Sequence, residues 1–130
     1  MIGIVMLDST YKRHLKRKIR NLRSSLYKYG LKLPKSKQMK EILKKYEICL
    51  YCSEKIQIDD YSPDHILPLD RGGSNTIDNI QFICIGCNRM KGNLTDEEFK
   101  WFLSFLKQNN EVYTRIRKRL RASGFMYFSK

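Results

Sequence analysis

The sequence lacks a long run of apolar residues: the apolar opening, residues 1–7, is short and meets a charge at Asp8. A membrane-spanning helix needs about 20 apolar residues, so neither a span nor a signal peptide is expected here. We therefore expect a soluble cytoplasmic protein that does not bind a membrane. Internal repeats and low-complexity linkers are also missing, and 130 residues suit one compact domain.

Acidic residues are scarce, with 13 Asp and Glu against 26 Lys and Arg, which leaves a net charge of +13. The excess lies at the two ends: residues 1–48 carry +11 and residues 96–130 carry +4, whereas residues 49–95 carry −2. Basic ends can grip a polyanion such as nucleic acid while a slightly acidic centre binds cations. The simpler alternative is that the basic runs are solvated helix faces.

Cysteine occurs only four times, in two C-x-x-C pairs, Cys49 with Cys52 and Cys84 with Cys87. A C-x-x-C turn lets two thiolates reach one ion, and two such turns complete a tetrahedral shell around Zn²⁺. Because a closed shell leaves no open position, this zinc is expected to be structural. Two disulfides, or four unrelated buried cysteines, are the alternatives, and neither explains the paired spacing well.

Two amphipathic helices are expected ahead of the cysteines, over residues 9–29 and 36–46. Apolar residues recur in the first at steps of three and four, typical of one buried helix face, namely Leu15, Ile19, Leu22, Leu26 and Tyr29. Gly30 is expected to end this helix. Its other faces are basic, and three arginines there are candidate contacts to nucleic acid: Arg13, Arg17 and Arg20.

Two further helices are expected after the second cysteine pair. Thr95 and Glu98 predict a capping box at the start of the first. Its many large apolar residues predict that it packs deeply, over the zinc centre. The second is expected to be basic, from about residue 111 to 122, ending before Gly124. The chain thus divides into a basic helical extension, residues 1–46, and one domain, residues 47–130.

Histidine is scarcer still: His14 lies in the first basic helix and His65 lies between the cysteine pairs. Short apolar runs at residues 62–69 and 80–85 are expected to be strands. Around and between them stand polar and glycine residues in a fixed order, Asp64-His65-Ile66-x-Pro68, Gly72-Gly73, Asn79, Cys84-x-x-Cys87-Asn88 and Lys91. This order resembles the HNH endonuclease family, whose core reads D-H-I-x-P, G-G, N, C-x-x-C-[HN] and K.

The resemblance implies an α+β fold, a small ββα-metal (His-Me finger) core held by the four-cysteine zinc site and flanked by basic helices. It implies that Asp64 and Asn88 bind a catalytic divalent cation and that Asn88 begins the helix. His65 would act as general base on the attacking water, and Asn79 would stabilise the loop and orient the His65 ring. Asn88 stands where many members have histidine, and its harder amide oxygen favours Mg²⁺ or Mn²⁺ over Zn²⁺ or Ni²⁺.

The residue types suit this chemistry. Phosphodiester hydrolysis needs an activated water and a cation for the charge that develops on the phosphate, and histidine accepts a proton near neutral pH. Neighbouring strand residues point to opposite faces, which would separate Asp64 from His65. Three basic residues near this centre are expected to meet phosphates of the partner, duplex DNA: Arg71, Arg89 and Lys91.

Each residue also has a simpler interpretation. His65 alone could be a half-buried strand histidine, Asp64 a turn residue, and the asparagines a loop residue and a helix N-cap. A non-catalytic, zinc-stabilised nucleic-acid-binding module is therefore the main alternative function. It would not need the side chains of Asp64, His65 and Asn88 to meet. A nuclease acting on RNA or branched DNA is a third possibility that no residue excludes.

Overall fold

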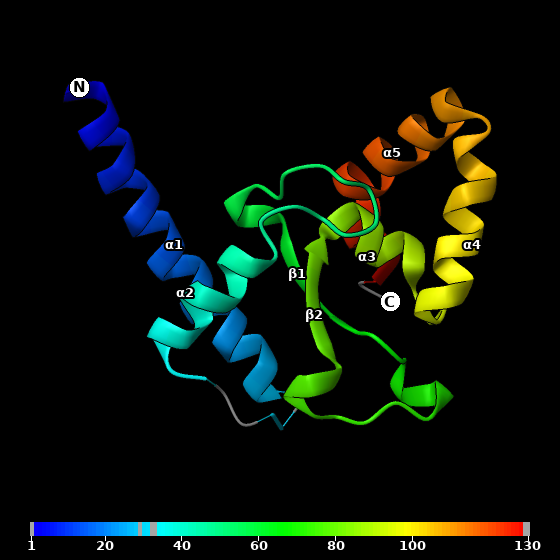
Figure 1. Ribbon diagram of the computed structural model, residues 1–130, viewed down its shortest axis with the longest axis horizontal. Coiled ribbons are helices and arrows are strands. Elements are labelled where there is room, and N and C mark those ends of the chain that lie inside the picture. Colours follow the sequence, from blue (N-terminus) through cyan, green and yellow to red (C-terminus); the bar gives the residue numbers. More distant parts are fainter. Residues whose placement is uncertain (1, 29, 32–33, 129–130) are drawn as a thin grey trace.

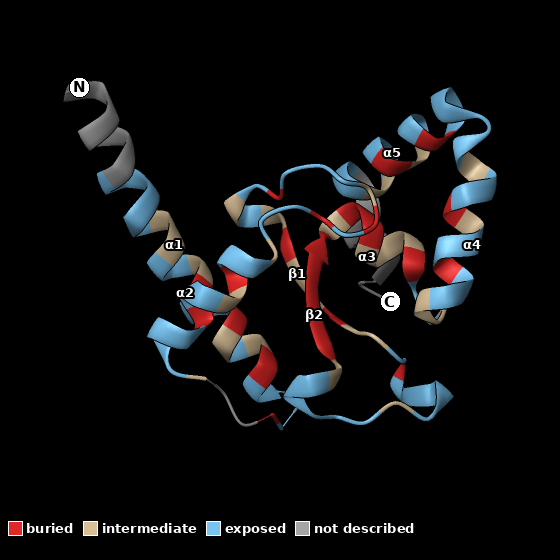
Figure 2. Ribbon diagram, viewed as in Figure 1, coloured by how far each residue is buried: buried red, intermediate tan, exposed pale blue. Residues whose placement is uncertain are grey.

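A computed structural model describes the backbone of residues 2–28, 30–31 and 34–128, and the side chains of residues 9–28, 30–31 and 34–122. Its centre is a two-stranded antiparallel hairpin of β1 (Tyr61–His65) and β2 (Ile80–Cys84). Tyr61 pairs with Cys84 at one end of the hairpin and His65 pairs with Ile80 at the other. Every residue of β2 is buried (Figure 2).

Helices enclose this hairpin from two sides (Figure 1). On one side lie α1 (Ile2–Lys28) and α2 (Ser36–Lys45), and on the other lie α3 (Ile85–Lys91), α4 (Asp96–Lys107) and α5 (Asn110–Phe128). Three short 3-10 helices complete the fold: η1 (Ile58–Asp60), η2 (Leu69–Arg71) and η3 (Ile77–Asn79). The predicted fold class is thus confirmed, a small ββα unit with a cysteine cluster between flanking helices.

The first helix follows its apolar stripe and its stop signal. Ile19, Leu22 and Leu26 are buried in the core, while Tyr29 of the stripe lies outside the described residues. Gly30 adopts a φ of 75°, and Leu31 N donates back to Leu26 O, which closes the helix end. The helix begins earlier than expected, at Ile2. No helix in the described part of the chain has the length and apolarity needed to cross a membrane.

The prediction that α4 packs deeply over the cysteine cluster is confirmed for one part of the helix, because buried Phe99 packs edge-on against Tyr51 of the Cys49–Cys52 turn. Its capping box is present, since Glu98 N donates to Thr95 and Thr95 N donates to Glu98. However, only Phe99 and Leu103 of this helix are buried, and Trp101 is 70% exposed. The helix that packs against α3 and reaches the cysteines is α5, which also continues past Gly124 to Phe128.

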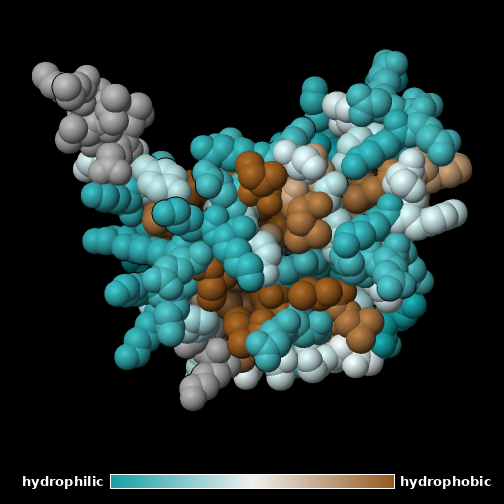
Figure 3. Space-filling view, in the orientation of Figure 1, coloured by the Kyte–Doolittle hydropathy of each residue, from teal (hydrophilic) through white to brown (hydrophobic). Residues whose placement is uncertain are grey.

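One core connects these layers. It extends from Ile19 on α1 through Phe82 and Ile83 of β2 to Phe99 on α4 and Tyr113 on α5. In the space-filling view, hydrophilic side chains cover α1 and α2 (Figure 3). The basic residues predicted to bind nucleic acid on α1 are therefore carried by a helix whose apolar face is anchored in the common core. The domain division at residue 46 stays a prediction.

Candidate functional site

The four cysteines form one compact cluster, in which the 49–52 turn meets the junction of β2 and α3. Their Sγ atoms lie within 4.8 Å of one another, and none is in a disulfide. The Sγ atoms of Cys52 and Cys84 are 3.8 Å apart, the spacing expected when sulfurs sit at tetrahedral corners about 2.3 Å from a central zinc. The donor set and spacing therefore fit a metal such as zinc. Among the described residues, no second group of three or more His, Cys, Asp or Glu gathers in this way.

A buried arginine from α5 completes the cluster. Arg117 Nη2 lies 3.2 Å from Cys52 Sγ, 3.7 Å from Cys84 Sγ and 3.0 Å from a Glu54 carboxylate oxygen. Burial acts to lower the pKa of Arg117, but its hydrogen bond to Glu54 and the charge on the cysteines outweigh burial and raise it. Hydrogen bonding from Cys52 lowers the pKa of Cys49 to about 6. The same hydrogen bonds lower the pKa of Cys84 but raise the pKa of Cys52 and Cys87, so a metal ion must displace protons from two of the four thiols when it binds.

The second cysteine pair also starts α3. Cys84 is the N-cap residue, and its Sγ accepts a hydrogen bond from Cys87 N at 3.4 Å. Asn88 therefore lies inside the helix, and the prediction that it begins the helix is wrong. An N-cap role for Asn88 is excluded for the same reason. The second cysteine pair and Asn88 are consequently held by one short helix.

Asp64, His65 and Asn88 line one pocket of about 380 Å³. Asp64 and His65 come from the end of β1, and Asn88 comes from α3, which packs against that strand. Asp70 and Asn93 lie on the pocket wall. These three residues, which a non-catalytic binding module would not need to bring together, therefore line the same pocket.

His65 is oriented by a residue that the motif did not include. Its Nε2 lies 3.1 Å from the amide oxygen of Asn75, in the loop between the strands. An amide oxygen only accepts hydrogen bonds, so this contact assigns the proton of the neutral ring to Nε2. The other nitrogen, Nδ1, then carries the lone pair that can accept a proton.

Asp64 is almost fully buried, at 6% exposed, and its carboxylate is held by two partners. Gln81 Nε2 donates to Asp64 Oδ2 at 2.9 Å and lies 3.0 Å from Tyr51 Oη, which in turn donates to Asp96. Lys91 Nζ lies 3.1 Å from Asp64 Oδ2 and 3.3 Å from Oδ1. A buried carboxylate needs such compensation, because an unpaired charge in the core is costly.

The amide of Asn88 is turned by its own hydrogen bonds. Its Nδ2 donates to Ser62 Oγ on β1 and lies 3.5 Å from Pro63 O. This use of the nitrogen leaves the amide oxygen, the atom that can bind a cation, for another partner.

Asn79 closes the loop that carries Asn75. Its side chain bonds Leu67 N at 3.0 Å, Leu67 O at 2.9 Å and Ser74 O at 2.8 Å, and its main-chain oxygen accepts from Ile66 N. A Cβ on Gly73 would lie 1.8 Å from Leu67 O, so only glycine permits this closure. The loop therefore links the residue after His65 to the segment that contains Asn75.

The structure places the basic residues of this region differently from the prediction. The side chain of Lys91 is 0% exposed, and Nζ also donates to the main-chain oxygens of His65 and Ile66. Its burial is at odds with the prediction that it meets a phosphate. Arg89 donates to Leu120 O and Arg121 O of α5, and Arg71 pairs with Glu98. Arg13, Arg17 and Arg20 are exposed on α1.

Four residues that hold the site residues in place were not predicted from the sequence, namely Ser62, Asn75, Gln81 and Arg117. Only Gln81 carried a signal, because a polar side chain within the apolar run 80–85 must find a partner when buried. Asn75 is one polar residue in a polar loop. Arg117 is one of several arginines on a basic helix.

Comparison with known proteins supports the motif. A family model described as HNH endonuclease matches residues 49–103. The matched segment contains both cysteine pairs, the hairpin, the pocket residues and the first part of α4. No curated protein matches the chain.

Proposed function

We propose that the protein hydrolyses phosphodiester bonds in duplex DNA, since residues 49–103 match a family model described as HNH endonuclease. The observation that carries the proposal is the meeting of Asp64, His65 and Asn88 in one pocket. The family implies a nucleic acid as substrate, and the charge of +13 suits a polyanion. A non-catalytic binding module has no need of this convergence, so the geometry favours the nuclease.

In the proposed reaction His65 Nδ1 accepts the proton of the attacking water. The hydrogen bond from Nε2 to Asn75 holds the ring in the form that can do so. The oxygen of the attacking water must align with the scissile phosphorus. Because the His65 ring is already fixed, less entropy is lost when it holds that water in line.

A hard divalent cation, Mg²⁺ or Mn²⁺, is proposed at the oxygens of Asp64 and Asn88. When bound, it would stabilise negative charge on the phosphate and the leaving oxygen. The carboxylate of Asp64 and the amide of Asn88 belong to residues that line one open pocket, and such oxygen donors fit an ion whose remaining ligands are commonly waters and phosphate oxygens. Lys91 beside Asp64 repels a cation, so binding is expected to be weak until DNA adds its own phosphate oxygens.

Metal preference tests the proposal. Supercoiled plasmid incubated with the zinc-loaded protein is expected to be nicked or cut with Mg²⁺ or Mn²⁺, and much more slowly with Ni²⁺ or added Zn²⁺. Asn88→His replaces a hard oxygen ligand by imidazole and is expected to move the preference towards Ni²⁺. Intact plasmid with every metal would overturn the nuclease, and an Asn88→His protein with the parent's preference would overturn Asn88 as a ligand.

Substitutions of Asn75 test the orientation of His65. Asn75→Ala is expected to slow cleavage by about tenfold or more, because the ring loses its acceptor. Asn75→Asp keeps an acceptor but adds a charge that favours imidazolium, so the acid limb of the cleavage–pH profile should move to higher pH. The control is Asp78→Asn, an exposed change in the same loop. If both Asn75 variants slow cleavage without moving the profile, the residue supports only the loop.

A further inference from the structure

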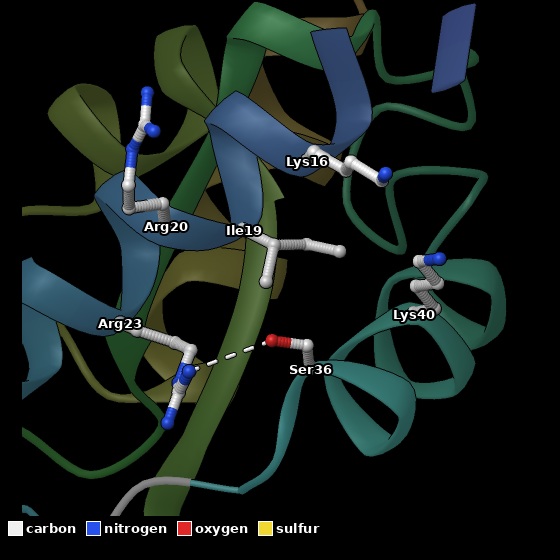
Figure 4. Close-up of a pocket in the computed structure, with 6 residues that line it drawn as sticks. All are labelled: Lys16, Ile19, Arg20, Arg23, Ser36 and Lys40. Atoms are coloured by element: carbon white, nitrogen blue, oxygen red, sulfur yellow. Dashed lines mark hydrogen bonds between the residues drawn. The ribbon is translucent and has the colours of Figure 1, made fainter. Parts of the chain in front are cut away.

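A second pocket lies between α1 and α2, far in sequence from the catalytic residues. It has a volume of about 380 Å³ and is lined by Lys16, Ile19, Arg20, Arg23, Ser36 and Lys40. The amino groups of Lys16 and Lys40 extend from the two helices into the gap, and Arg23 reaches across to Ser36, whereas Arg20 points away (Figure 4). We call this pocket the α1–α2 groove.

Helix spacing explains the gathering of charge. Lys16 and Arg23 stand at i and i+7 on α1, and Ser36 and Lys40 stand at i and i+4 on α2, so each pair shares one helix face. No carboxylate is among the lining residues. The buried side chain of Ile19 forms an apolar wall that cannot screen the charges. Such a groove focuses a positive potential and attracts an anion.

Arg23 supplies a more specific sign of a missing partner. Its Nη1 lies 3.4 Å from Ser36 Oγ, a long contact. Its Nε is buried and meets no acceptor in the part of the chain that the structure describes. Buried donors are nearly always paired. An anionic oxygen in the groove would give the Arg23 guanidinium a charged partner and offset the repulsion between Lys16 and Lys40.

We propose that the α1–α2 groove binds a backbone phosphate of the nucleic acid, at a position distinct from the scissile phosphate. The inference rests on the proposed function for its ligand. The groove is lined by residues of α1 and α2, whereas the catalytic pocket is lined partly by Asn88 of α3. These helices lie on opposite sides of the hairpin (Figure 1). The same phosphate therefore cannot occupy both. The groove also lies outside residues 49–103, which the family model matches.

A matched pair of double variants of the full-length, zinc-loaded protein tests the groove. The groove variant is Lys16→Gln with Lys40→Gln. The control is Lys28→Gln with Lys37→Gln, which also removes one exposed lysine from each helix but outside the groove. Fluorescence anisotropy on a labelled 30-base-pair duplex, without added Mg²⁺, gives Kd across a series of salt concentrations.

The groove variant is expected to bind about tenfold more weakly at 0.1 M salt and to lower the salt slope by about one, as for the loss of a phosphate contact. The control should lose about threefold or less, because it removes only long-range attraction. If the groove variant and the control lose DNA affinity equally, the groove is not a phosphate site, and the lysines act only through long-range attraction. Inorganic phosphate that binds the parent's groove while both variants keep full DNA affinity would also overturn it.

Cleavage separates this inference from the nuclease proposal. With saturating DNA and Mg²⁺, the groove variant should cut at the parent's single-turnover rate, since none of its changes touches the pocket of His65. If the parent protein binds DNA through the groove but never cuts it, the nuclease proposal is contradicted and the groove proposal stands. A groove variant that binds normally yet cuts slowly would overturn the groove as a binding site.

Discussion

His65→Ala protein is expected to cut DNA about 100- to 10,000-fold more slowly than the parent, the usual contribution of a general base. The imidazole lines the catalytic pocket beside Asp64 and Asn88, and Asn75 directs its Nδ1 to the role of acceptor. DNA affinity should be largely unchanged, because basic residues elsewhere carry the attraction to phosphates. Single-turnover cleavage of a labelled duplex with Mg²⁺, beside an anisotropy measurement, checks both statements.

The chain supplies its own control in His14, its only other histidine. His14 lies on α1, and His14→Ala should cut within about threefold of the parent, because it removes no proton acceptor from the pocket. Small amines such as imidazole, added to the His65→Ala protein, should restore part of the rate by replacing the missing base. Undiminished cleavage by His65→Ala would show that another group activates the water.

The ordered motif predicted the centre of the fold because its residues act locally. Residues of β1, the glycine loop and the second cysteine pair are close in sequence, so spacing alone places them on strands, turns and a helix start. The meeting of Asp64 with Asn88 followed only from resemblance to the family. It depends on how α3 packs against β1, and no local preference determines that packing.

Contacts over long sequence distances escaped prediction. Arg117 reaches Cys52 across 65 residues, and no pattern distinguishes it from its basic neighbours on α5. Lys91 looked like a phosphate ligand because lysine is usually exposed. Its burial follows from the position of Asp64, whose carboxylate needs a counter-charge in the core. On α4, counting apolar residues overstated burial because Trp101 and Phe105 stack on each other at the surface.

Loss of Arg117 is expected to weaken zinc binding by about 10- to 100-fold, the usual effect of removing a hydrogen-bond partner of a ligand. This range corresponds to about 1.4–2.8 kcal/mol of binding free energy. Four thiolates on Zn²⁺ carry a charge of −2, and the guanidinium offsets part of it from within the protein. Arg117→Gln keeps a donor but loses the charge, and competition with a chromophoric chelator measures its zinc affinity. Lys118→Gln, an exposed change at the next position of α5, is the control.

The same contact should couple zinc to the position of α5. Zinc removal is expected to speed amide exchange in α5 as well as in the C-x-x-C turns, because the freed thiolates take up protons and buried Arg117 then keeps only Glu54 as a charged partner. Since Arg89, next to Asn88, donates to main-chain oxygens of α5, release of α5 should also loosen the helix that holds a proposed catalytic ligand. Exchange that rises only around the cysteines, with α5 protected as before, would contradict the coupling. If exchange rises both around the cysteines and in α5, then α5, which lies outside the matched family segment, carries the effect of zinc to the catalytic pocket.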